Sequence, residues 1–218
     1  ALLALDPHMS CSAIVVLLAA GMLFIGGIQL KWFGMVLGAI ASALLYLVIF
    51  TDKLTYANNR ISGWLDPFSP AAGVDTWQTR QGLYAIGSGG ALGLGLGNSR
   101  QKYLYIPEPQ NDFIFSVVCE ELGFIGAIFI LLLFALLVWR GMIISIRAKD
   151  KFGMLLGIGL TAQVGLQVIL NISVVTNTIP NTGISLPFFS YGGTSLMMLL
   201  AQMGVILSIS RSSHMQKN

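Results

Sequence analysis

Charged side chains are scarce in this chain. They make up 10% of its 218 residues, and hydrophobic residues make up 55%. A soluble domain of this size carries about 25% charged residues. The mean hydropathy is +0.78. The composition excludes an ordinary soluble enzyme and predicts an integral membrane protein of the all-α class, built as a polytopic helical bundle.

Several other features are lacking as well. The two cysteines, Cys11 and Cys119, lie at or within apolar runs, so neither a disulfide framework nor a metal site is indicated. No basic stripe alternates with aromatic residues, which argues against a nucleic-acid partner. The glycine-rich residues 87–97 are not followed by Gly-Lys-Ser/Thr and lack the Gly-x-Gly-x-x-Gly spacing. We therefore expect no nucleotide or organic cofactor.

Long apolar runs are what the chain does have. A membrane-spanning helix needs about 20 apolar residues, and five segments meet this length: residues 11–30, 32–50, 112–139, 152–175 and 189–210. The long loop 51–111 separates the second span from the third. Within it, residues 75–86 are predicted to form a short helix with Asp75 as its N-cap. Residues 87–97 are too glycine-rich to span, and we expect them to lie on or dip into the outer leaflet.

The distribution of basic residues predicts the orientation. Lys and Arg are concentrated on one side of the predicted bundle, at Lys31, Arg140, Arg147, Lys149, Lys151, Arg211 and Lys217. Short basic loops face the cytoplasm, whereas long loops count little in this rule. The C-terminus is therefore predicted to be cytoplasmic and the loop 51–111 to face outward.

Two groups of polar residues interrupt the predicted spans. Glu120 and Glu121 are adjacent in the third span, where a carboxylate is costly and indicates a functional site by default. They either pair with groups of the protein or face a substrate cavity. Gln163, Gln167 and Asn171 share one face of the fourth span. Their amides either bond to neighbouring helices or line a polar cavity.

The end of the outward loop concentrates polar chemistry. Six such residues fall close together there: Arg100, Lys102, Glu108, Gln110, Asn111 and Asp112. Two cations beside a membrane suit the diphosphate of a lipid-linked substrate. A carboxylate held nearby can take a proton from a hydroxyl nucleophile. The alternative is a salt-bridged outer loop without catalytic function.

Three motifs resemble the SEDS family (shape, elongation, division and sporulation). They are Pro107-Glu-Pro-Gln-Asn-Asp112, Glu120-Glu-Leu-Gly-Phe-Ile-Gly, and Ile184-Ser-Leu-Pro-Phe-Phe-Ser190-Tyr191-Gly192-Gly193-Thr-Ser. The resemblance covers essentially the whole chain and is nearer to the division and sporulation branch than to the rod-elongation branch. It implies a single partial domain over residues 1–218, which supplies helices six to ten of a ten-helix fold. We accordingly expect the chain to be the C-terminal part of a longer protein.

The resemblance also implies an activity. Its members are peptidoglycan glycosyltransferases of the bacterial plasma membrane, and the aspartate that they require maps onto Asp112, the implied general base. The substrate is lipid II, and the implied partners are a class B penicillin-binding protein and other divisome proteins. A divalent cation, Mg²⁺ or Mn²⁺, is a candidate for stabilising the leaving diphosphate, but no metal ligands are identified. The turn Ser190, Tyr191, Gly192 and Gly193 either packs helices closely or lines the substrate cavity.

Two departures from the family pattern limit what is carried over. Gln110 and Asn111 stand where many members have His-Thr, so a proton relay through an imidazole is not expected here. His8 replaces an acidic residue of the common pattern. Two alternative functions remain open, a flippase for the lipid-linked precursor and a non-catalytic component of the divisome. The concentration of charge around Asp112 favours the polymerase, because a transporter needs polar groups across the whole membrane.

Overall fold

The computed structural model describes residues 9–29, 31, 34–35, 38, 42, 53–68, 76–103 and 106–214. Within these ranges the secondary structure is helical and contains no strand, so the predicted all-α class is confirmed. The chain divides into two compact units, Ala1–Thr76 and Trp77–Asn218, which are described separately.

The first unit contains α2 (Met9–Ile25) and α4 (Lys53–Leu65). Helix α2 overlaps the predicted span 11–30. It begins two residues earlier, at Met9, and ends at Ile25, because the chain turns at Gly27 with a left-handed φ of 85°. Residues 32–50, predicted as the second span, lie mostly outside the described residues. Helix α4 falls within the predicted long loop and was not expected from the sequence.

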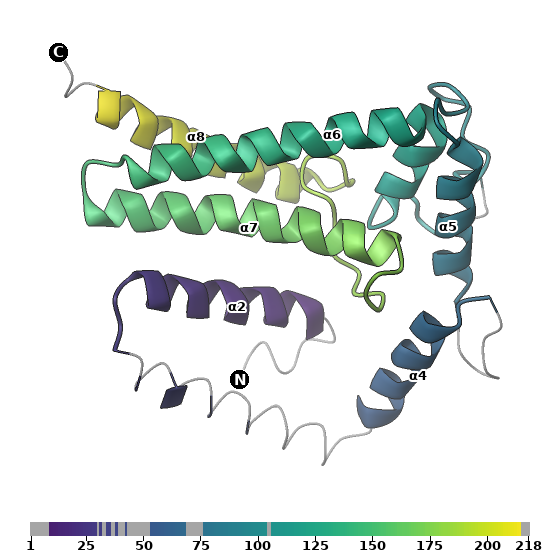
Figure 1. Ribbon diagram of the computed structural model, residues 1–218, viewed down its shortest axis with the longest axis horizontal. Coiled ribbons are helices and arrows are strands. Elements are labelled where there is room, and N and C mark those ends of the chain that lie inside the picture. The colour runs from purple at the N-terminus through teal and green to yellow at the C-terminus, as the bar shows by residue number, and fades with distance from the viewer. Residues whose placement is uncertain are drawn as a thin grey trace. The chain divides into compact units, whose positions relative to one another are not determined.

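The second unit contains α5 (Trp77–Gly89), α6 (Ile114–Ile146), α7 (Lys151–Val175) and α8 (Gly193–His214). Helices α6 and α7 run side by side, α8 packs against both, and α5 crosses one end of α6 (Figure 1). Three of the described helices, α6, α7 and α8, are long and apolar enough to cross a membrane. These helices correspond to the predicted spans 112–139, 152–175 and 189–210.

Small residues allow α6 and α7 to approach closely. A Cβ atom added at Gly141 of α6 would lie 2.7 Å from Thr161 Oγ1 of α7. The reciprocal contact is made by Gly157 of α7, where a Cβ would lie 2.4 Å from Ser145 Oγ. Small residues at helix contacts are typical of membrane bundles, where close van der Waals packing drives association.

The segments that connect the helices of the second unit lie at two opposite ends of the bundle. The turn from α6 to α7 carries Arg147, Lys149 and Asp150, and the Asp150 side chain caps α7 by accepting a hydrogen bond of 2.9 Å from the Gly153 N–H. The C-terminal part of α8 lies at this same end (Figure 1). Asp112 precedes α6 and therefore lies at the opposite end. The predicted orientation depends on this separation of the basic turn from Asp112. The orientation itself stays a prediction.

The helix bounds differ from the predicted ones for identifiable reasons. Helix α6 continues past Trp139 to Ile146, because the exposed Arg140 does not interrupt it. Helix α8 begins only at Gly193, because Leu186 and Ser190 form a turn in which the Leu186 N–H donates to Ser190 Oγ over 2.7 Å. The short helix predicted at 75–86 is confirmed as α5; its expected N-cap, Asp75, lies outside the described residues.

Candidate functional site

Helix α6 is broken near its start, and this break organises the site. Gly123 has a non-helical conformation with φ 68° and ψ −171°. The segment after α5 docks into the break. The Leu94 and Gly95 N–H groups donate to the Glu120 and Glu121 carbonyls over 2.9 and 3.0 Å, respectively. Backbone groups freed by the break are therefore bonded again, as non-helical backbone at membrane depth requires.

The second half of the broken helix is capped in the same way. The Phe124 N–H donates to the Gly90 carbonyl over 2.9 Å, and the Ile125 N–H donates to the Ala91 carbonyl over 3.2 Å. The backbone of residues 90–95 thus takes the place of a missing helical turn on both sides of Gly123.

Glycine is required at the contact between this loop and the helix. A Cβ at Gly93 would lie 2.2 Å from the Glu121 carbonyl oxygen, and one at Gly123 would lie 2.3 Å from the Gly93 nitrogen. Both glycines also have a left-handed φ, which other residues adopt at a cost. The glycine-rich stretch is therefore a docking loop for a helix break. Its expected place in the outer leaflet stays a prediction, although Leu92 and Leu96 are exposed on it.

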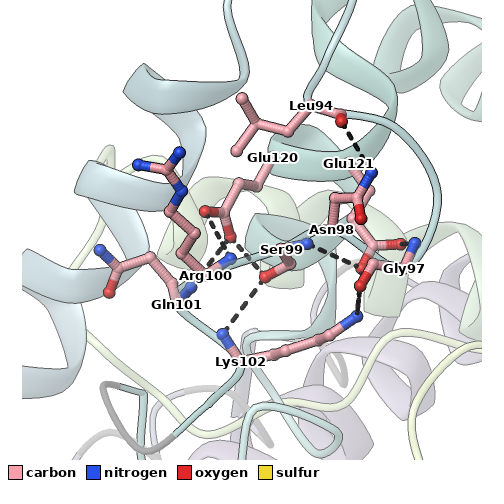
Figure 2. Close-up of polar contacts among 9 residues, drawn as sticks. All are labelled: Leu94, Gly97, Asn98, Ser99, Arg100, Gln101, Lys102, Glu120 and Glu121. Carbon is pink, nitrogen blue, oxygen red and sulfur yellow. Dashed lines mark hydrogen bonds and ion pairs between the residues drawn. The ribbon is translucent and has the colours of Figure 1, made fainter.

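Glu120 is buried, with 1% of its surface exposed, and its carboxylate is bonded to residues 99–101, which follow the docking loop. Its carboxylate accepts hydrogen bonds from Ser99 Oγ over 2.5 Å, from the Arg100 N–H over 3.0 Å and from the Gln101 N–H over 3.3 Å. Figure 2 shows the carboxylate enclosed by these donors. Three donors offset the cost of burying a charge.

Glu121 holds the same loop from its other side. Its carboxylate accepts hydrogen bonds from the Gly97 N–H over 2.9 Å and from the Ser99 N–H over 3.4 Å. It also pairs with Lys102, whose Nζ lies 2.7 Å from Glu121 Oε1 and 2.7 Å from the Gly97 carbonyl. The hydrogen bond to Glu121 raises the pKa of Lys102. Of the two interpretations of these glutamates, the structure places both carboxylates against groups of the protein (Figure 2).

The two cations predicted to bind a diphosphate differ in their surroundings. Lys102 is neutralised by Glu121. Arg100 contributes its backbone N–H to Glu120, but among the described residues its exposed guanidinium group makes no hydrogen bond or ion pair. No dashed line reaches that group in Figure 2. Arg100 is the cation that remains available for an anionic group.

Asp112 lies in the short segment between this loop and α6. It is partly buried, and Gly183 lies beside it, so that a Cβ added there would be 3.6 Å from Asp112 Oδ2. Within the described part of the chain, the carboxylate accepts no hydrogen bond from another residue and forms no ion pair. The Asp112 backbone is nevertheless fixed, because its carbonyl accepts a hydrogen bond of 2.7 Å from Asn171 Nδ2.

The surroundings of Asp112 raise its pKa above the ordinary value. Burial is the largest cause, and the negative charge of Glu108 adds to it, while the Asp112 backbone N–H lowers the pKa. Glu108 lies in a tight turn with a left-handed φ of 43°, and its carboxylate accepts a 2.6 Å hydrogen bond from Asn111 Nδ2. A carboxylate with a raised pKa is a stronger base than an exposed one.

The turn before α8 is joined to the segment that carries Asp112. The Tyr191 N–H donates to the Gln110 carbonyl over 2.8 Å, and the Tyr191 side chain is 82% exposed. Gly193 has no atom within 4 Å of an added Cβ, so close packing among the described residues does not explain that glycine. Ser190 bonds within the turn. The structure therefore brings this motif next to Gln110, two residues before Asp112, while its role in substrate binding stays a prediction.

Sequence reasoning missed some of the residues that shape the site. Ser99, 1% exposed, joins Glu120 to the loop, and Gly93 and Gly123 make the docking possible. The glycines of residues 87–97 were a signal visible in the sequence. The helix break at Gly123, onto which they dock, was not. The predicted amide face on α7 is partly explained by interhelical bonding, because Gln202 Nε2 of α8 donates to Gln163 Oε1 over 3.3 Å.

The described residues do not form a metal site by themselves. Among them, no group of three or more His, Cys, Asp and Glu side chains is placed to hold a metal ion. Mg²⁺ in phosphate-handling sites is usually bound by one or two carboxylates together with substrate phosphates. The predicted divalent cation stays a prediction.

Comparison with known proteins identifies the family. The family model named for FtsW, RodA and SpoVE and described as "Cell cycle protein" matches residues 1–215. Stage V sporulation protein E of Bacillus subtilis (strain 168) is 44% identical over 209 residues, which are 95% of this chain and 56% of that protein. The probable peptidoglycan glycosyltransferase FtsW of the same organism is 39% identical over 215 residues, covering 96% of this chain and 53% of the relative.

A solved structure is also similar. It is described as "Structural coordination of polymerization and crosslinking by a peptidoglycan synthase complex", and the matched chain has a TM-score of 0.71 and 28% identity. The match covers 97% of this chain and 58% of the other. The chain thus spans about half the length of the curated relatives that it matches. With a family match over nearly its whole length, the chain belongs to the FtsW, RodA and SpoVE family, the SEDS proteins that its motifs resemble.

Proposed function

We propose that this chain forms part of a peptidoglycan glycosyltransferase that polymerises lipid II during division or sporulation, with Asp112 as the general base. One observation carries the assignment of the base. Asp112 has no hydrogen bond or ion pair from another described residue, whereas Glu120 and Glu121 are engaged by loop donors. The names of the relatives, probable peptidoglycan glycosyltransferases, support the reaction class.

The reaction needs a base because a sugar hydroxyl is a poor nucleophile. In the proposed step, Asp112 takes the proton from the 4-hydroxyl of the acceptor's GlcNAc. The oxygen then forms a bond to the anomeric carbon of the donor's MurNAc. The bond from that carbon to the diphosphate breaks, and undecaprenyl diphosphate leaves with the electron pair. A direct displacement of this kind converts the α-linked donor into a β-1,4-linked product. The raised pKa of Asp112 supports its role as proton acceptor.

The leaving diphosphate requires positive charge. Arg100 is the candidate, because its guanidinium is exposed and unpaired among the described residues. Guanidinium groups bind phosphate oxygens through two parallel hydrogen bonds. A divalent cation carried by the diphosphate would supply further charge, and no step in the proposed chemistry is assigned to protein-held metal.

The proposed setting is the bacterial plasma membrane, with the loop 51–111 outside and the C-terminus in the cytoplasm. We further propose a class B penicillin-binding protein as the transpeptidase partner, within the division machinery. The similar solved structure, described as a synthase complex for polymerisation and crosslinking, supports a partner of this kind. The proposal concerns a polypeptide of the full length of the relatives, since this chain matches about half of them.

The test is lipid II polymerisation by the full-length protein with its transpeptidase partner. Labelled lipid II is converted to glycan chains, which are separated on a gel, and wild type is compared with Asp112→Ala. We expect polymer from the wild type and none from a folded variant. Equal polymer from both would show that Asp112 is not the base. No polymer from either, beside an active control polymerase, would overturn the transferase assignment and favour the flippase.

A further inference from the structure

Asn171 binds the backbone of the residue proposed as the base. Its Nδ2 donates to the Asp112 carbonyl over 2.7 Å and to the Ile184 carbonyl over 2.7 Å. Asn171 lies on α7 and is completely buried, with 0% of its surface exposed. One amide therefore ties three parts of the chain together, namely the segment before α6, the C-terminal end of α7 and the loop between α7 and α8.

This connection holds the backbone on two sides of the Asp112 carboxylate. Gly183, beside Asp112 Oδ2, immediately precedes Ile184, one of the two residues whose carbonyls Asn171 holds. A second contact, from the Tyr191 N–H to the Gln110 carbonyl over 2.8 Å, joins the same two loops further out. Releasing the amide would remove the hydrogen bond that anchors the Asp112 backbone to α7.

Packing alone does not account for an asparagine at this position. Its Oδ1 is buried and has no hydrogen-bond partner among the described residues. An unpaired buried polar atom is costly, and the large majority of such atoms in proteins are bonded. An apolar side chain would avoid that cost but would leave the Asp112 and Ile184 carbonyls without this donor. Local rules of this kind are broken mainly at functional sites, where another gain offsets them.

We propose that Asn171 is a positioning residue for the glycosyl transfer, which holds Asp112 at the geometry that the acceptor hydroxyl requires. The inference rests on the proposed function, in which Asp112 is the base. A displacement of about 1 Å in a catalytic group can lower the rate about 100-fold. Asn171 itself does not reach the carboxylate in this structure, and it acts through the Asp112 backbone.

The test compares Asn171→Ala with Gln163→Ala in the full-length protein. Both variants remove a side-chain amide from the same helix, but Gln163 bonds to Gln202, not to the site. For Asn171→Ala we expect kcat for lipid II polymerisation to fall about 30- to 100-fold with KM within about threefold. For Gln163→Ala we expect both constants to stay near the wild-type values.

The pH dependence separates positioning from a general loss of structure. Burial and the charge of Glu108 hold the pKa of Asp112 above its ordinary value, so the rate falls with acidification at a higher pH than for an exposed aspartate. Loosening the Asp112 segment exposes the carboxylate and lowers its pKa. We therefore expect the acidic limb of the pH–rate profile to move to lower pH in Asn171→Ala and to stay unchanged in Gln163→Ala.

A failure of the positioning role can be told apart from a failure of the proposed function. If Asp112→Ala retains wild-type polymerisation, Asp112 is not the base and the proposed function fails. If Asp112→Ala is inactive while a folded Asn171→Ala has the kcat and acidic limb of Gln163→Ala, only the positioning role is overturned. Should Asn171→Ala not fold, Asn171→Ser is measured in its place, and a wild-type kcat and limb there would equally overturn it.

Discussion

Two carboxylate regions lie on either side of the start of α6, and they are built in opposite ways. Glu120 and Glu121 are surrounded by donors from residues 97–102, including the Lys102 ammonium group. Asp112, eight residues before Glu120, has a fixed backbone but a carboxylate without a partner among the described residues. The carboxylates of the first region hold a loop through hydrogen bonds and an ion pair. The carboxylate of the second region is left available for a substrate group.

The difference shows how a membrane protein uses acidic residues near the bilayer. Charge within an apolar segment indicates function by default. Here the same segment contains carboxylates whose donors are all supplied by the protein, and those carboxylates secure the loop that leads to Asp112. The structural carboxylates differ from the available one in having hydrogen-bond donors from the protein, and the sequence does not reveal these donors.

The docking loop depends on glycine where it meets the helix break. Gly93→Ala places a Cβ 2.2 Å from the Glu121 carbonyl oxygen at a left-handed φ, so we expect a loss of roughly 4 kcal/mol in the free energy of unfolding. Gly97→Ala has a similar φ of 81° but nothing within 4 Å, and we expect about 1 kcal/mol. Denaturation in detergent measures both. Equal losses would contradict the docking described for Gly93.

The buried glutamate should behave as a structural group. Glu120→Gln keeps the shape of the side chain but replaces one carboxylate oxygen with an NH₂ group. That group cannot accept the hydrogen bond that the oxygen accepted from a backbone N–H. We expect a loss of roughly 2 to 3 kcal/mol in the free energy of unfolding, since buried donors lose their acceptor. Glu121→Gln is the control and should lose less, because it is more exposed. A Glu120→Gln protein as stable as wild type would refute the structural role.

The smallest effect is expected at the exposed cation. Arg100→Gln keeps the backbone N–H that bonds to Glu120 and removes only the guanidinium group. We expect KM for lipid II to rise about tenfold, since one charged hydrogen-bonding group contributes about 1.5 kcal/mol. Steady-state kinetics measure the change. An unchanged KM would show that the diphosphate is bound elsewhere.

Much of the fold could be predicted from apolar length and motif order. The spans 112–139, 152–175 and 189–210 correspond to α6, α7 and α8, because about 20 apolar residues have few other stable forms in a bilayer. The break at Gly123 could not be predicted, since a glycine within an apolar run usually continues a membrane helix. The distant loop 90–95 stabilises the break, because it forms new hydrogen bonds to the broken backbone.

The candidate site was predictable in composition but not in its pairings. The cluster from Arg100 to Asp112 stood out through its charge, and the resemblance singled out Asp112. The sequence left open whether the glutamates paired within the protein or faced a substrate. That choice depends on Ser99 and Lys102, about 20 residues away along the chain, whose side chains meet the glutamates only in the folded protein.

The most direct test of the account compares Asp112→Asn with Glu121→Gln. Both changes remove one negative charge and keep the side-chain shape. The measurement is the initial rate of lipid II polymerisation per folded molecule of the full-length protein with its transpeptidase partner. We expect Asp112→Asn to lose about 1,000-fold, since a lost general base costs about 10²- to 10⁴-fold, and Glu121→Gln to remain within about threefold of wild type. A Glu121→Gln protein as inactive as Asp112→Asn, or an active Asp112→Asn protein, would contradict the division of roles between the two carboxylate regions.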